Sequence, residues 1–145
     1  TNKEKRKIYN SKPETIEYRK KYDLAHKSQQ LQRQKNYKNR LRMSALIHYS
    51  KSVSNTDTPT CSCCGENSVI DFLCIDHIKG KKVMENDNEL VTLGYSSKWD
   101  TSKLMLWLKN NNYPSGFQVL CHNCNFAKGM VKNNYTCPHE LEVSQ

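Results

Sequence analysis

The chain has 145 residues, which is enough for one compact domain with an extension. Only 36% of the residues are hydrophobic, so the core is small and we expect a metal ion or disulfide bonds to stabilise it. No run approaches the roughly 18 apolar residues of a membrane-spanning helix, and residues 1–5 do not begin a secretory signal, so no membrane anchor is expected. The formal net charge of +9 predicts a polyanionic partner, either nucleic acid or an anionic surface.

Positive charge is concentrated at the N-terminal end of the chain. Residues 1–53 hold 15 Lys and Arg against 4 Asp and Glu, whereas residues 54–145 hold 8 against 10. The stretch 12–49 is rich in helix-forming residues and lacks glycine, which predicts a helix that starts at Ser11 and has Pro13 in its first turn. The polar run 52–59 ends in proline and favours a boundary there. We therefore expect a mostly helical basic arm at 1–53 and a second domain at 54–145.

The composition of this arm favours contact with nucleic acid. Apolar residues are sparse before Leu41, so the first half has little to bury. Ammonium and guanidinium groups neutralise phosphates, and the interleaved tyrosines can stack or form hydrogen bonds, although a solvated charged helix is the alternative. The residues expected to bind nucleic acid are Arg19, Lys20, Lys21, Arg33, Lys35, Lys38, Arg40 and Arg42, and the tyrosines among them are Tyr9, Tyr18, Tyr22 and Tyr37.

The remainder of the chain predicts the order strand, insertion, strand and helix. β-Branched, aromatic and turn-forming residues mark the strands and turns, and closely spaced apolar residues mark the helices. The expected elements are a tight turn at 61–65, a strand at 69–75, a polar insertion at 79–100, a short helix at 102–109, a turn at 110–116, a strand at 117–120 and a helix at 122–130 that ends near Gly129. The insertion at 79–100 is either a loose loop or a further contact with DNA.

Two C-x-x-C motifs give the strongest signal, and they are Cys61 with Cys64 and Cys121 with Cys124. A two-residue spacer lets both sulfurs of a pair reach one ion at about 2.3 Å, and four thiolates fill a tetrahedron, which predicts a structural zinc. The odd total of seven cysteines favours reduced thiols in an intracellular protein over a disulfide framework. Cys63 competes for a place in the site, although adjacent cysteines chelate poorly together, and Cys74 is expected to be a buried strand residue.

Two further features place polar groups that suit chemistry on phosphate. The strand at 69–75 runs into Asp76 and His77, and on a metal-dependent nuclease a histidine can deprotonate water while a carboxylate binds a divalent cation. Asn125 and Lys128 follow the last cysteine pair, where an amide oxygen can bind a hard cation and an ammonium group can reach a phosphate. In isolation, an Asp-His dipeptide is more often a satisfied histidine in a turn.

In combination these motifs resemble the HNH endonuclease family. C-x-x-C-G, a strand with D-H-I and a hydrophobic strand leading into L-C-x-x-C-N-x-x-K-G follow the family's order over roughly residues 59–140. Segments 116–121 and 137–139 look like a branch found among phage and mobile-element nucleases. The resemblance implies an α+β fold, namely a small zinc-stapled ββα-metal (HNH/His-Me finger) core with an N-terminal basic helical extension.

The resemblance also implies roles for individual residues. His77 would be the general base, Asp76 and Asn125 would bind a catalytic Mg²⁺ or Mn²⁺ ion, and the four paired cysteines would bind the structural zinc. One position departs from the family pattern, because Gly116 stands where the family has an asparagine that braces the loop orienting the histidine. Asn112, Ser115 or a backbone carbonyl could take over that role.

The function implied is hydrolysis of phosphodiester bonds in double-stranded DNA, as in a homing or phage enzyme. The cation would stabilise the leaving 3′ oxygen, and candidates for phosphate contacts are His122, His139 and Lys128. Abundant Lys, Asn and Tyr suit a phage, virus or organelle origin. Two alternatives remain open. One is a non-catalytic nucleic-acid-binding protein that keeps the fold, for example in an RNA assembly, and the other is a zinc-stapled protein-interaction domain.

Overall fold

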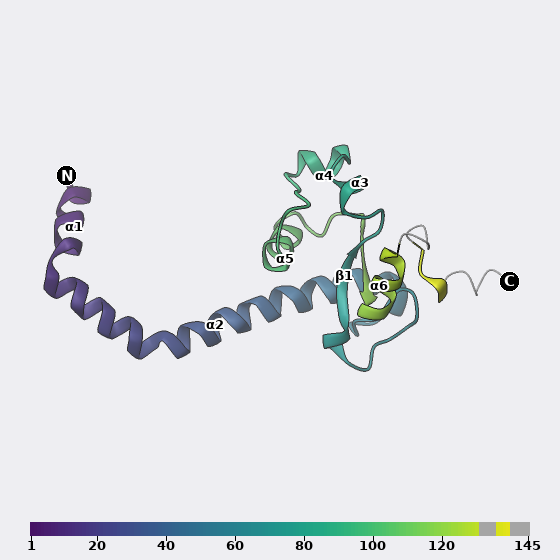
Figure 1. Cartoon of the computed structure of the whole chain (residues 1–145), viewed down its shortest axis with the longest axis horizontal. Helices are drawn as coiled ribbons and strands as arrows, with labels where there is room; N and C mark the ends of the chain where they lie inside the picture. The colour runs from purple at the N-terminus through teal and green to yellow at the C-terminus, as the bar shows by residue number, and fades with distance from the viewer. Residues whose placement is uncertain (131–135, 140–145) are drawn as a thin grey trace. The chain divides into compact units, whose positions relative to one another are not determined.

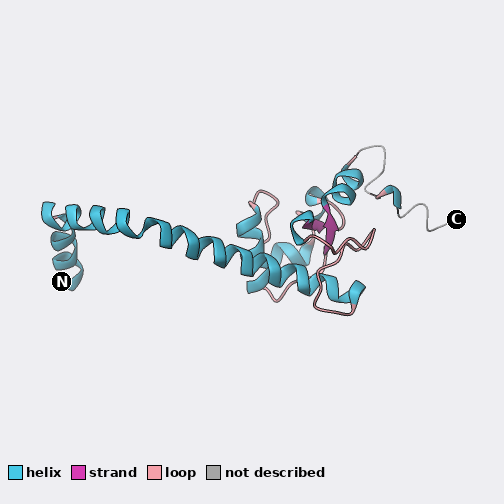
Figure 2. Cartoon of the chain, turned by 90° about the horizontal axis from the view of Figure 1, so that it is seen from below, coloured by secondary structure: helices cyan, strands magenta, loops and turns pink. Residues whose placement is uncertain are grey.

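The computed structural model describes residues 1–130 and 136–139 and shows a mixed α+β protein that is mostly helical, with one small sheet (Figures 1 and 2). Among these residues no helix is both long enough and apolar enough to cross a bilayer. The chain divides into two compact units, Thr1–Lys38 and Asn39–Gln145. The elements are α1 (Asn2–Ser11), α2 (Pro13–Ser54), β1 (Leu73–His77), α3 (Lys81–Met84), α4 (Asn88–Thr92), α5 (Thr101–Asn110), β2 (Phe117–Cys121) and α6 (His122–Gly129).

The first unit consists of α1 and the first part of α2. Lys12 separates the two helices in an extended conformation (φ −66°, ψ 135°), because Pro13 disfavours the helical conformation in the residue before it. The helix start predicted at Ser11 lies two residues early, because Ser11 ends α1, which was not predicted, and α2 begins at Pro13. Every residue from Thr1 to Lys38 is at least partly exposed. This unit therefore has no apolar core of its own.

The second part of α2 belongs to the second unit. Leu41, Ala45, Leu46 and Ser50 are buried on one face of the helix. The sequence places the boundary between arm and domain at 53–54, where α2 ends, but the compact units divide after Lys38. The difference arises because the apolar side chains of this helical segment contribute to the core of the following domain.

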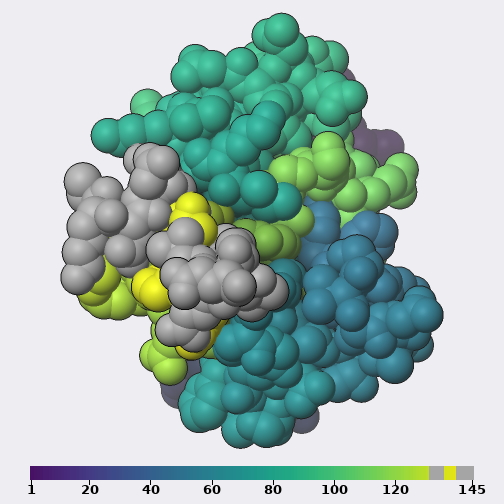
Figure 3. Space-filling view, turned by 90° about the vertical axis from the view of Figure 1, so that its right-hand side faces the viewer, coloured from purple at the N-terminus to yellow at the C-terminus, as the bar shows by residue number. Residues whose placement is uncertain are grey.

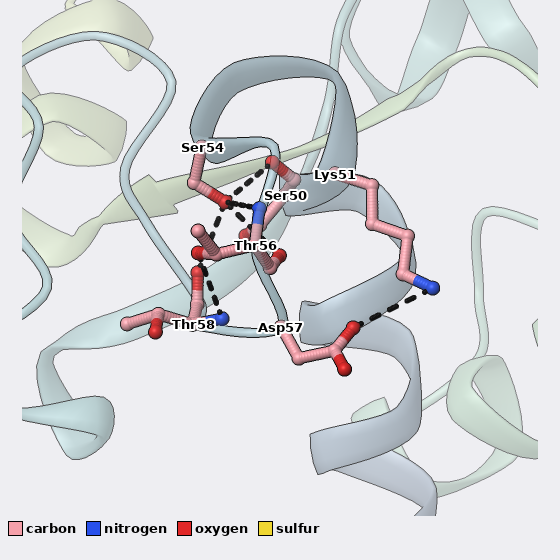
Figure 4. A network of polar contacts seen from close by, with 6 residues as sticks. All are labelled: Ser50, Lys51, Ser54, Thr56, Asp57 and Thr58. Carbon is pink, nitrogen blue, oxygen red and sulfur yellow. Dashed lines mark hydrogen bonds and ion pairs between the residues drawn. The ribbon is translucent and has the colours of Figure 1, made fainter.

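The loop after α2 is held close to the end of the helix (Figure 4). The Ser54 hydroxyl lies 3.1 Å from the carbonyl oxygen of Ser50, and Lys51 forms an ion pair with Asp57 at 3.5 Å. The buried hydroxyl of Ser50 accepts a hydrogen bond of 2.9 Å from the amide of Thr60. These contacts fix the chain immediately before the first cysteine pair.

The sheet consists of β1 and β2, which run antiparallel with Leu73 opposite Cys121 and His77 opposite Phe117. The first strand begins at Leu73 rather than at residue 69, because Ile70–Phe72 forms a 3-10 turn, and it extends to include His77. A two-stranded sheet is marginally stable alone. Here α6 packs against both strands, and it lies beside β1 in Figure 1.

Two apolar clusters form the core of the second unit. One surrounds α5 and includes Trp107 and Leu108, and the other surrounds the cysteines and includes Leu46 and Leu120. Both clusters receive residues from α2, which explains why its C-terminal part folds with the domain.

The polar insertion at 79–100 is not a loose loop. It forms α3 and α4, and Met84, Leu90 and Tyr95 from this segment are buried in the core. The Asp87 carboxylate caps α4 by accepting a hydrogen bond of 3.1 Å from the amide of Glu89. Figure 3 shows this segment at one end of the visible face and the residues between α2 and β1 at the other. Three apolar residues spaced along a polar stretch are thus sufficient to anchor it.

Candidate metal centre and adjoining cavity

The first cysteine pair lies in a tight turn that is attached to the sheet. The amide of Gly65 donates to the carbonyl oxygen of Cys61 at 3.1 Å, and Gly65 has a φ of +77°, a conformation that favours glycine. The amide of Ser62 donates to the carbonyl oxygen of Val119 in β2 at 2.8 Å. The turn is therefore held beside the end of β2, where the second cysteine pair begins.

The second pair spans the junction between β2 and α6, and it completes a four-sulfur cluster. Cys121 is the N-cap of α6, and its sulfur accepts from the amide of Cys124 at 3.4 Å. The sulfurs of Cys61, Cys64, Cys121 and Cys124 all lie within 4.8 Å of one another. Cys64 and Cys121 are 3.7 Å apart, close to the separation of about 3.8 Å for two sulfurs on one tetrahedral zinc. The predicted cluster is confirmed as a group that could hold a structural metal ion.

The thiols of this cluster are crowded in a way that suits a cation. Burial raises the pKa of the Cys124 thiol far above its ordinary value, and the sulfurs of Cys121 and Cys64 raise it further. Thiols that are this close resist joint ionisation in the absence of positive charge. A metal ion deprotonates the thiols that coordinate it and so removes this conflict.

A cavity of about 480 Å³ lies beside the end of β1 and the inner face of α6. It brings together the three residues expected to be catalytic, which come from two elements that are distant in sequence. The polar and charged residues that line it include Arg42, Asp76, His77, Lys81, His122, Asn125 and Lys128. Three of these are cationic and one is anionic, so the cavity suits an anionic ligand.

Asp76 is neutralised by a lysine from α6. Its carboxylate oxygen Oδ2 accepts from Gln118 Nε2 at 2.8 Å and forms an ion pair with the ammonium group of Lys128. Lys128 also donates to the carbonyl oxygen of His77 at 3.0 Å, and only 5% of its surface is exposed. Sequence reasoning assigned Lys128 to phosphate and missed this partner. The one-turn spacing from Asn125 was the available signal, because it puts both side chains on the same face of α6.

The Asp76–Lys128 pair is expected to be important for stability. Replacing Lys128 by methionine would leave a buried carboxylate without its partner, and should reduce the free energy of unfolding by about 3–5 kcal/mol in urea denaturation. The double variant Asp76→Asn with Lys128→Met should recover most of that loss, because it removes both charges. An unchanged urea midpoint for the single variant would show that the ion pair contributes nothing.

His77 is buried at the end of β1 among aromatic rings. Its imidazole lies 5.1 Å from the ring of Phe117 and 5.9 Å from that of Tyr95, measured between centroids. The pKa of His77 is lowered to about 4, mainly by burial and next by the charge of Lys81, while Asp76 offsets part of the effect. The imidazole is therefore neutral at neutral pH and can accept a proton.

A backbone carbonyl holds the segment that follows His77. The amide of Ile78 donates to the carbonyl oxygen of Gly116 at 3.0 Å, and the amide of Gly80 donates to that of His77 at 2.8 Å. Gly116 has a φ of +100°, which strains any residue with a side chain, and an added Cβ would lie 2.9 Å from the end of Met84. The carbonyl of Gly116 therefore holds the residue that follows His77.

The basic residues expected to bind nucleic acid differ in accessibility. Arg42 is partly buried, and its guanidinium group donates to the carbonyl oxygens of Ile70 at 2.7 Å and Leu73 at 2.8 Å. Both bonds use Nη2, and Nη1 lies 3.4 Å from the carboxylate of Asp71, so much of the guanidinium group is already engaged within the domain. The remaining basic residues of α2 that are expected to bind nucleic acid are all exposed, and they are Arg19, Lys20, Lys21, Arg33, Lys35, Lys38 and Arg40. The tyrosines of the arm are exposed as well, namely Tyr9, Tyr18, Tyr22 and Tyr37.

Comparisons of the chain with protein-family models, with curated proteins and with solved structures find no match. The fold and the site therefore define the class of protein in coarse terms. It is a mostly helical α+β protein with a cysteine cluster that could bind a metal ion. A cavity with both polar and apolar lining adjoins the sheet, and its lining includes a histidine whose pKa is lowered.

Proposed function

We propose that this protein is a metal-dependent HNH-type endonuclease that hydrolyses phosphodiester bonds in double-stranded DNA. The observation that carries the proposal is the cavity in which His77 and Asp76 from β1 meet Asn125 from α6. The family that the sequence resembles has the same order of elements, which here is β1, β2 and α6. It also has a cysteine cluster at the junction between the second strand and the helix, as this chain does. None of these features depends on the basic arm.

In the proposed reaction, the imidazole of His77 accepts a proton from a water molecule that attacks the phosphorus in line. Because the pKa of His77 is lowered, the ring is neutral when the reaction begins and has a free nitrogen to accept the proton, but it is a weaker base than an exposed imidazole. Lys81 lines the same cavity and offers a positive charge to the phosphodiester. The carbonyl of Gly116 holds the backbone after His77 and so helps to fix the ring's position.

Asp76 and Asn125 would hold the divalent cation, because carboxylate and amide oxygens suit Mg²⁺ or Mn²⁺. In the structure the ammonium of Lys128 occupies the position beside Asp76 that the cation would take. When bound, the ion would stabilise negative charge on the leaving 3′ oxygen. Lys128 would have to leave Asp76 and would then be free to contact phosphate.

Plasmid nicking in Mg²⁺ or Mn²⁺ tests the proposal. Asn125→Ala should raise the metal concentration needed for half-maximal cleavage by at least about tenfold, because an oxygen ligand is lost. Asn123→Ala is the matched control, since Asn123 is an exposed residue of the same helix that does not line the cavity. Equal metal dependence for both variants would contradict the assignment of Asn125.

A second candidate function is nucleic-acid binding without cleavage. The feature that favours it is the closed state of the site, in which Lys128 already neutralises Asp76 and only 7% of the surface of His77 is exposed. DNA binding without nicking at any Mg²⁺ or Mn²⁺ concentration would support this reading over the first.

We further propose that the exposed helix of the first unit holds DNA. Deleting residues 1–38 should weaken DNA binding and make it less dependent on salt. The reason is that each phosphate contact contributes about −0.9 to the slope of the logarithm of the binding constant against the logarithm of the salt concentration. The deletion should not extend to residue 45, since Leu41 and Ala45 are core residues of the second unit. Fluorescence anisotropy at several salt concentrations measures the effect.

Single substitutions refine this prediction. Arg33→Ala and Lys35→Ala, which both lie in the deleted segment, should each reduce the salt slope by about one if the residue touches phosphate. Lys109→Ala on α5 removes the same charge outside the arm and should leave the slope unchanged. Equal binding by the full-length and shortened proteins at every salt concentration would refute a role of the arm in DNA binding.

A further inference from the structure

A second group of metal-ligating side chains shares Cys124 with the four-cysteine cluster. Its members are Cys63, Cys124, Cys137 and His139, and their ligand atoms lie within 4.8 Å of one another. Nδ1 of His139 is 3.5 Å from the sulfur of Cys124 and 3.6 Å from that of Cys137. A sulfur at about 2.3 Å and a nitrogen at about 2.0–2.1 Å from one tetrahedral zinc are separated by about 3.6 Å. These contacts have the separation that a shared ion imposes.

The position of Cys63 supports a separate ion. Cys61 and Cys64 on either side of it belong to the first cluster, and adjacent cysteines chelate a single ion poorly. The second cluster gives Cys63 partners from other parts of the chain, namely the start of α6 and the segment 136–139. Cys137 is only 1% exposed although it lies outside any strand or long helix. The thiol of Cys137 and the imidazole nitrogen of His139 are the two kinds of ligand that zinc prefers.

We propose that the chain binds two zinc ions that share the thiolate of Cys124. The first ion takes Cys61, Cys64, Cys121 and Cys124, and the second takes Cys63, Cys124, Cys137 and His139. A thiolate sulfur has several lone pairs and can donate to two ions at once. Six thiolates and one imidazole are a soft ligand set that suits zinc. Each ion then has four protein ligands, so neither has an open position for substrate.

The charge balance of such a centre is favourable. Six thiolates and two divalent ions leave a net charge of minus two, which equals that of one zinc with four cysteines. Each coordinating thiol releases its proton to solvent as the bond to the metal forms. The second ion would fasten segment 136–139 to the cysteine turn and to the start of α6, and it does not involve the cavity that contains His77.

The number of zinc ions per chain tests the proposal. The full-length protein, purified under reducing conditions and dialysed against a weak chelator, is examined by native mass spectrometry and elemental analysis. We expect two zinc ions in the wild type and one in His139→Ala, whose imidazole is exposed and can be removed without opening the core. His122→Ala and Cys74→Ser remove an exposed histidine and a strand cysteine outside both clusters, and should retain two ions.

Cadmium NMR of the metal-exchanged protein identifies the ligands directly. The wild type should give two signals, one typical of four sulfurs and one typical of three sulfurs with one nitrogen, and His139→Ala should lose the second. Cys137→Ser provides an independent loss of the same ion. One zinc per chain in the wild type would overturn the proposal. If both His139→Ala and Cys137→Ser retained two ions, the second ligand set would be overturned. The number of zinc ions in the wild type tests the two-ion proposal even if a variant does not fold.

Discussion

Replacing His77 by alanine is expected to lower the rate of DNA cleavage by about 10²–10⁴-fold while DNA affinity stays nearly unchanged. The reason is that His77 is proposed to accept the proton of the attacking water, whereas the charges proposed to bind DNA lie on the arm. Single-turnover plasmid nicking measures the rate, and fluorescence anisotropy with a labelled duplex measures the affinity. The two readouts together separate a lost base from a lost binding surface.

A matched histidine variant controls for the loss of an imidazole. His48 lies on α2, stacks on Tyr113 at 4.5 Å and does not line the cavity with His77, so His48→Ala should cleave at the wild-type rate. If His77→Ala cut DNA as fast as the wild type, the proposed base would have to be abandoned. A parallel fall in rate and in affinity would instead indicate that the substitution disturbs the fold of the site.

Removing metal from the cysteine cluster is expected to unfold the second unit. The only sheet in the described part of the chain has two strands, and Cys121 connects its second strand to α6. Structural zinc contributes about 10–16 kcal/mol of apparent binding free energy in small domains, which is comparable with the entire stability of a domain of about 5–15 kcal/mol. Either a strong chelator or Cys121→Ser should therefore abolish cooperative thermal unfolding of this unit.

Tryptophan fluorescence is the appropriate readout for this experiment. Both tryptophans of the chain, Trp99 and Trp107, lie in the second unit, whereas circular dichroism would also report the long helix α2. Cys74→Ser is the matched control, because Cys74 belongs to β1 and to neither metal-ligating group. A Cys121→Ser protein with an unchanged melting temperature would contradict a stapling role, as would folded protein that contains no zinc.

The sequence predicts well those features that depend on neighbouring residues. The start of α2 is predicted from Pro13 to within two residues, and the turn that holds the first cysteine pair follows from Gly65, whose φ is positive. Thiols with a two-residue spacer can converge on one ion, so the meeting of Cys61, Cys64, Cys121 and Cys124 could be predicted across a separation of more than fifty residues. In each case one residue type restricts the local conformation strongly.

Apart from the meeting of the two cysteine pairs, features that depend on distant partners were not predicted. The boundary after Lys38 reflects the packing of Leu41 and Ala45 against residues far along the chain, and composition alone does not reveal it. The buried pairing of Lys128 with Asp76 joins α6 to β1, and a lysine in a motif that resembles a nuclease is more simply interpreted as a phosphate contact. The catalytic roles of His77, Asp76 and Asn125 stay predictions, although the cavity brings all three together.

The continuity of α2 affects how its exposed half is ordered. Starting a helix is unfavourable because several residues must be fixed before the first hydrogen bond forms, whereas each later residue adds its own bond. The buried turns from Leu41 to Ser50 provide that nucleus, so the residues from Lys38 back to Pro13 need only propagate an existing helix. Helical order should therefore decrease gradually toward Pro13. A polyanion that binds along the arm then meets a backbone that is already ordered, so binding has to restrict less conformational entropy.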